Sequence, residues 1–131
     1  MGVKQLVAGI VFILMVLTLF ASVVSAHHST AGYDTKKEVI LRGTVTSFVW
    51  RNPHVLVFWD VKDENGKVVN WNGQMNSPTS MIQVNMNRNS LKPGDEIIVT
   101  ANPSKTGLPL SVIVKITMAD GTLVVDRQTP Q

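Results

Sequence analysis

Residues 39–50 read Val-Ile-Leu-Arg-Gly-Thr-Val-Thr-Ser-Phe-Val-Trp and are followed by Arg51-Asn52-Pro53. β-Branched and aromatic residues are enriched in strands, whereas an Asn-Pro pair marks a turn. The stretch therefore predicts a long β-strand that ends at this turn. Gly43 in its middle indicates a bulge, or a sharp bend of the kind that closes small barrels.

Further short strands follow on the C-terminal side. Asn65-Gly66 is a strong hairpin signal between two β-rich runs, and Ser77 before Pro78 is typical of a helix start. The expected strands lie at residues 54–61, 68–74, 96–101, 111–118 and 122–125, and the expected helix lies at 77–84.

Three strands, a helix and then two strands is the element order of a Greek-key barrel of the OB type. We therefore predict an all-β fold, a small OB-like barrel of five to six strands with one short helix. Small β-sandwiches and SH3-like barrels also present short strands with regular turns, and they are the alternatives.

On the N-terminal side, the chain begins with a segment typical of export signals. Lys4 gives it a positive start, residues 6–20 form an uncharged and mostly apolar run, and Val24-Ser25-Ala26 is a pattern that signal peptidases cut after. Cleavage there predicts a periplasmic or secreted bacterial protein. The alternative is an uncleaved anchor, because residues 6–24 approach the roughly 20 residues that span a bilayer.

The predicted organisation has a single domain. We expect a signal helix at residues 1–26, an entry segment at 27–37, the barrel at 38–126 and a loose tail at 127–131. The mature chain would have 131 minus 26, or 105, residues, which suffices for one small domain.

Composition excludes several function classes. The chain has no cysteine, which excludes disulfides, thiolate zinc sites, iron–sulfur clusters and cysteine nucleophiles. Without Lys4, its 12 basic residues become 11 against 9 acidic ones, a mature net charge of +2. Such a low charge predicts no nucleic-acid partner. No segment after the signal is apolar enough to span a bilayer, so membrane contact is expected only through an uncleaved signal segment.

The chain has three histidines, His27, His28 and His54. If cleavage follows Ala26, the free amine and Nδ1 of His27 can chelate one ion, and His54 beside the Asn-Pro turn can complete a three-nitrogen site. Such a ligand set favours Cu(II). Alternatively, the amine, the His28 amide and the His28 imidazole could bind copper on a flexible tail. The simplest alternative is a solvated tail, with His54 hydrogen-bonded in a turn.

Two further groups of residues have a structural and a functional interpretation. Methionine is a soft Cu(I) ligand but is more often core filler, and three methionines have neither helical nor strand spacing: Met75, Met81 and Met86. Tryptophans on strands can stack on bases or sugars: Trp50, Trp59 and Trp71. Side chains alternate between the two faces of a strand, so Trp59 shares a face with Val55, Val57 and Val61, and this apolar face favours a core position for Trp59.

No catalytic constellation is present in the sequence. The adjacent acids Asp63-Glu64 and Asp95-Glu96 lie at turns, and neither a nucleophile elbow nor a phosphate-binding glycine pattern occurs. We therefore predict no catalytic residues and a binding role. That role is copper binding or, alternatively, recognition of a periplasmic protein or glycan by an OB-like module through loops near Asn52 and residues 102–107.

Several separated motifs resemble those of a known family. They are Ala26-His27-His28-Ser29, Leu41-Arg42-Gly43-Thr44-Val45, Trp50-Arg51-Asn52-Pro53-His54, Val69-Asn70-Trp71 and Leu91-Lys92-Pro93-Gly94-Asp95. The chain is similar over residues 26–125 to a family of small exported bacterial proteins of unknown function. The resemblance implies a small periplasmic β-barrel and brings no established activity. The position of His27 is also similar to that of the terminal histidine in histidine-brace copper proteins.

Overall fold

The computed structural model describes residues 2–5, 7 and 30–127, and the chain forms two units, Met1–Ala31 and Gly32–Gln131. The fold described below belongs to the second unit. The predicted cleavage point and, apart from Val7, the apolar run before it lie outside the described residues, as do His27 and His28. None of the helices within the described residues is long and apolar enough to cross a membrane.

The second unit contains the expected strands and one short helix. Their bounds are β1 Val39–Val49, β2 Leu56–Lys62, β3 Val68–Gln74, α2 Pro78–Gln83, β4 Glu96–Pro103, β5 Leu110–Met118 and β6 Leu123–Asp126. Every end lies within about two residues of its predicted position, the margin within which assignments of element ends differ.

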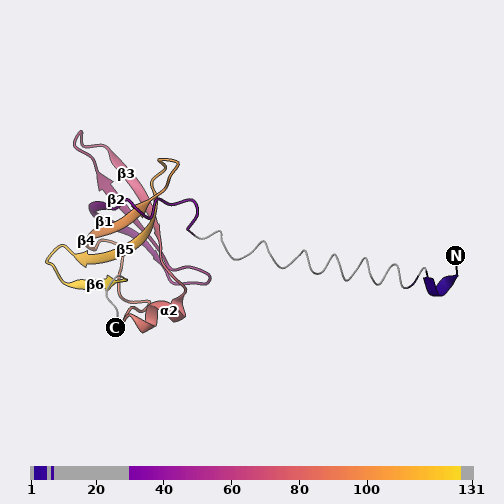
Figure 1. Cartoon of the computed structure of the whole chain (residues 1–131). Coiled ribbons are helices and arrows are strands. Elements are labelled where there is room, and N and C mark those ends of the chain that lie inside the picture. The colour runs from indigo at the N-terminus through magenta and orange to yellow at the C-terminus, as the bar shows by residue number, and fades with distance from the viewer. Residues whose placement is uncertain (1, 6, 8–29, 128–131) are drawn as a thin grey trace. The chain divides into compact units, whose positions relative to one another are not determined.

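Five of the strands close into a barrel. β1 pairs antiparallel with β2 and β4, β2 pairs with β3, β4 pairs with β5, and a parallel pairing of β3 with β5 joins the two ends. β6 lies outside this ring, on β5. The ring, with α2 between β3 and β4, confirms the predicted all-β, OB-like Greek-key barrel (Figure 1).

β1 belongs to both halves of the barrel. Its residues 39–44 pair with β4 and its residues 44–49 pair with β2. A Cβ on Gly43, just before this change of partner, would lie 2.1 Å from the backbone oxygen of Asp60 in β2. Gly43 therefore permits close approach of two backbones. Of the two alternatives predicted at Gly43, a bulge or a sharp bend, the bulge lies further along the strand, because the register of β1 shifts between Val45 and Ser47.

The barrel interior is built around Trp59, whose side chain is fully buried. Its indole lies between two glycines. A Cβ on Gly43 would stand 2.9 Å from Cδ1 of the indole, and a Cβ on Gly73 would stand 3.0 Å from Cζ3. Trp71 of β3 stacks beside Trp59 with ring centroids 6.3 Å apart. The two glycines make the space that the tryptophan fills, which maintains close packing.

Helix α2 begins at a side-chain cap. Ser77 is the N-cap residue, its Oγ accepts a hydrogen bond from the backbone N of Ser80 at 3.4 Å, and Pro78 occupies the first turn. The helix buries Met81 in the core. The predicted cap and the predicted proline position are therefore both confirmed.

We expect Ser77→Ala to lower the free energy of unfolding by about 0.5–1 kcal/mol, because a first-turn N–H loses its acceptor. Urea unfolding measures this change. Thr79→Ala, at an exposed position of the same helix, is the matched control and should change stability by less than about 0.5 kcal/mol. Equal effects of the two substitutions would show that the Ser77 cap contributes nothing.

Candidate functional site

His54 lies in the loop between β1 and β2, two residues before β2 begins. The backbone of the next residue, Val55, is fixed against the end of β3. Its N–H donates to the carbonyl of Asn76 at 3.1 Å, and its carbonyl accepts from the N–H of Met75 at 2.8 Å. This pairing holds His54, which is half-buried, beside Met75.

The imidazole of His54 has a defined orientation. Its Nδ1 lies 3.0 Å from the backbone oxygen of Met75. A carbonyl oxygen only accepts hydrogen bonds, so Nδ1 is the donor and the neutral ring carries its free lone pair on Nε2. Metal-binding histidines typically donate their second ring nitrogen to a carbonyl or carboxylate in this way. The same contact also satisfies the simpler prediction that His54 hydrogen-bonds in a turn.

The other two predicted ligands, His27 and His28, lie outside the described residues. The predicted grouping of His27, His28 and His54 therefore stays a prediction. Within the described part of the chain, no group of three His, Cys, Asp or Glu side chains could hold a metal ion.

A cation that the sequence analysis missed lies near this loop. Arg127 donates from Nη1 to the carbonyl of Ile113 at 2.7 Å and from Nη2 to Oδ1 of Asn76 at 3.0 Å. Burial lowers the pKa of Arg127, but a guanidinium remains charged in proteins. Residue 127 is the first residue of the predicted tail, 127–131. Its side chain contacts β5 and the loop after β3, and no sequence pattern distinguishes it from a solvated arginine.

We expect Arg127→Met to lower the free energy of unfolding by about 1–3 kcal/mol, because two acceptors lose their donor. Arg88→Met, at an exposed position after α2, is the control and should change stability by less than about 0.5 kcal/mol. Urea unfolding of both variants measures the difference. Indistinguishable midpoints would mean that Arg127 does not fasten the end of β6 to the barrel.

The predicted structural roles of the methionines and of Trp59 are confirmed. The three methionines are each 1% exposed and belong to the hydrophobic core: Met75, Met81 and Met86. Trp59, Val55 and Val57 are fully buried, as their shared parity predicts, whereas Val61 is partly buried. Trp50 packs edge-on against Phe48, with ring centroids 6.0 Å apart.

The two loops predicted to recognise a partner leave different ends of the barrel strands. β1 and β4 are antiparallel, so the loop after β1, with Asn52, and the loop after β4 start from opposite ends. The first contacts Asn76, whereas the second contacts β3 through the bond from the N–H of Asn72 to the carbonyl of Pro109. The second loop carries Leu108, which is 55% exposed.

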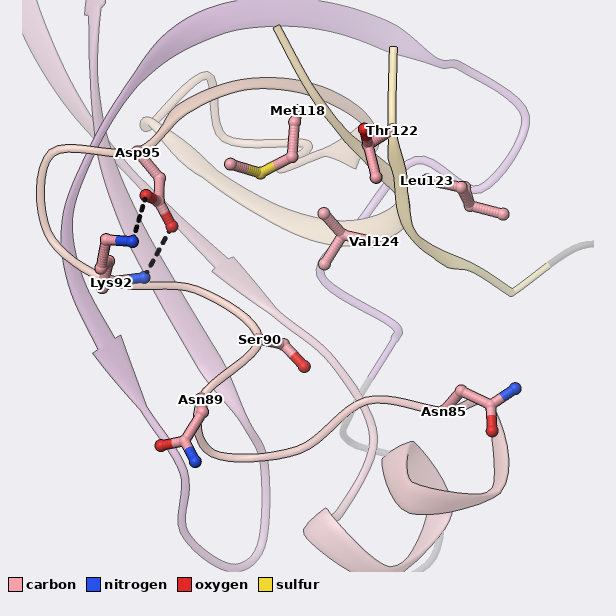
Figure 2. Close-up of a pocket in the computed structure, with 9 residues that line it drawn as sticks. All are labelled: Asn85, Asn89, Ser90, Lys92, Asp95, Met118, Thr122, Leu123 and Val124. Atoms are coloured by element: carbon pink, nitrogen blue, oxygen red, sulfur yellow. Dashed lines mark hydrogen bonds and ion pairs between the residues drawn. The ribbon is translucent and has the colours of Figure 1, made fainter. Parts of the chain in front are cut away.

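A hollow of about 350 Å³ lies between the segment that follows α2 and the β5–β6 hairpin (Figure 2). Asn85, Asn89 and Ser90 line one side, and Met118 with the hairpin residues 122–124 lines the other. Its two charged groups pair with each other: Lys92 Nζ lies 3.7 Å from Asp95 Oδ1, and the Lys92 N–H donates to Asp95 Oδ2 at 2.9 Å. The contacts between Lys92 and Asp95 therefore stabilise the turn that joins these two residues.

Fold and site together define a small OB-type β-barrel protein with one oriented histidine at a loop. The model of a family of unknown function, DUF6152, matches residues 15–111, and the chain belongs to this family. This match confirms the resemblance to a family without an established activity. No curated protein matches the sequence.

Proposed function

We propose that this protein is an exported periplasmic β-barrel that binds copper through its mature N-terminus. The ligands are the amine and Nδ1 of His27, with Nε2 of His54 as the third nitrogen, and His28 is the substitute if His54 is not used. The observation that carries the proposal is the hydrogen bond from His54 Nδ1 to Met75, which leaves Nε2 available in a fixed ring. The role is binding, without a catalytic residue.

The chemistry of the donors favours copper over other metal ions. Imidazole and amine nitrogens bind Cu(II) more strongly than the other divalent first-row metals. Ca²⁺ and Mg²⁺ prefer oxygen ligands, so a set of amine and imidazole nitrogens disfavours both ions.

Cu(II) titration of the protein isolated from cells, with its N-terminus established by sequencing, tests the proposal. Loss of an outer-shell hydrogen bond already weakens metal sites by roughly 10–100-fold, so His54→Ala should weaken binding at least tenfold. His28→Ala is the matched control and should leave the affinity unchanged. A loss of Cu(II) affinity only in His28→Ala would assign copper to the flexible tail. Unchanged affinity in both variants would contradict the proposed site.

A second candidate is an interaction module that recognises a periplasmic protein or glycan without metal. The exposed Leu108 in the loop between β4 and β5 favours it, because binding residues commonly lie on loops that a rigid scaffold positions. Pull-down with and without a chelator separates the candidates. Binding that survives both chelation and His27→Ala supports the module, and binding that both treatments abolish supports the copper site.

A further inference from the structure

Trp71 lines two hollows of the barrel. The β2–β3 hairpin, which borders the larger one, extends on the side of the barrel away from α2 (Figure 1). One hollow, of about 520 Å³, opens between the first half of β1 and the hairpin, and the other, of about 360 Å³, opens toward the loop between β4 and β5. Both volumes fall in the range of small-molecule sites, roughly 300–1,000 Å³, and barrel mouths are a common location. Within the described residues, His54 lines neither hollow.

The floor of the larger hollow is apolar. Leu41, Val61, Val69 and Trp71 line it, and all four are only partly buried because the barrel is open here. Each belongs to the inward-facing set of its strand. Trp71 stacks against the fully buried Trp59, and this contact restricts the orientation of its ring. A rigid aromatic with aliphatic neighbours is suited to an aliphatic chain.

The rim of the larger hollow carries two cations and two carboxylates, and their formal charges balance. Arg42 and Lys62 line the larger hollow, and within residues 30–127 neither forms an ion pair. Among the acids, Asp63 accepts the backbone N–H groups of Asn65 and Lys67 in its own turn. Glu64 is the remaining acid of the larger hollow. Two unpaired cations above an apolar floor complement an anionic head on an apolar chain.

We propose that the Trp71 hollows bind a single-chain amphiphilic anion, an aliphatic chain that carries one carboxylate. The chain lies along Trp71, and the carboxylate is bound by Arg42 and Lys62. A guanidinium can bind a carboxylate through two parallel hydrogen bonds, so Arg42 makes the larger contribution. This site is independent of the copper proposal, because its residues and its ligand are different.

Titration of the isolated protein with dodecanoate, below the concentration at which it forms micelles, tests this site by calorimetry and tryptophan fluorescence. Arg42→Gln should weaken binding about tenfold, the usual scale for a lost hydrogen bond to a charged group. Glu64→Gln should strengthen it, because a repelling charge is removed. Arg51→Gln, an exposed arginine in the loop after β1, is the matched control and should have no effect. Thermal unfolding verifies that each variant is folded.

Two further probes distinguish other occupants. Dodecyltrimethylammonium has the same chain with the opposite charge, so it should bind more weakly than dodecanoate to the native protein. Equal binding of both amphiphiles, or equal effects of Arg42→Gln and Arg51→Gln, would overturn the proposal. Binding to anionic phospholipid vesicles without binding of monomeric dodecanoate would also overturn it, and would assign the surface to membranes.

Discussion

Gly43→Ala is expected to lower the free energy of unfolding by about 3 kcal/mol or more, the upper range for overpacked interiors. The added Cβ would meet the backbone oxygen of Asp60 at 2.1 Å and Cδ1 of Trp59 at 2.9 Å. A backbone oxygen cannot rotate away as the end of a side chain can. β1 and β2 must therefore separate where β1 changes partner. Urea unfolding measures the loss, and failure of the variant to fold would be the extreme form of the same result.

Two other glycines calibrate this prediction. A Cβ on Gly73 would approach Cδ1 and Cγ1 of Ile113, each at 2.5 Å, but these are side-chain rather than backbone atoms, so Gly73→Ala should destabilise the protein less than Gly43→Ala. A Cβ on Gly32 would meet nothing within 4 Å, so Gly32→Ala should be nearly neutral. Any other order of the three stabilities would contradict the view that backbone contact at Gly43 closes the barrel.

One extra glycine ahead of His27 is expected to remove the dependence of copper affinity on His54. In the proposed mature terminus, the amine and Nδ1 of His27 belong to the same residue and leave a position for His54. After the insertion, the amine belongs to another residue, and the terminus can bind copper through its own amide nitrogen instead. His54→Ala should then cost less than about twofold in the extended chain, against at least tenfold in the native chain.

The four affinities of this cycle, with and without the glycine and with His54 or alanine, come from the same Cu(II) titration. Such a cycle isolates the coupling between two groups if each change removes only their interaction. A glycine inserted after Ser29 is the control for chain length. It keeps His27 at the proposed terminus and should preserve the dependence of copper affinity on His54. An equal effect of His54→Ala in the native and extended chains would exclude a shared site.

Most of the barrel can be predicted from the sequence because its signals are local. The Asn65-Gly66 pair defines the β2–β3 hairpin, and Ser77 with Pro78 defines the start of α2. Strand ends follow turn residues in the same way. The bulge of β1 could not be located from local signals, because it depends on the register of pairing with β2.

The site is less predictable because its contacts are distant in sequence. The bond of His54 to Met75 spans 21 residues, and that of Arg127 to Asn76 spans 51. Nothing near Arg127 in the sequence indicates that barrel closure brings it to the end of β3. The apolar floor around Trp71 is likewise formed only when the closed barrel brings β1, β2 and β3 together. Parity predicts that these side chains face inward, but it does not show that the barrel stays open there.

Pulsed electron paramagnetic resonance of the Cu(II)-loaded protein tests the central claim most directly, because it detects the non-coordinating nitrogen of each bound imidazole. The account predicts modulation from two imidazoles, His27 bound through Nδ1 and His54 bound through Nε2, and from one imidazole in His54→Ala. Identical modulation in the native protein and in His54→Ala would contradict it.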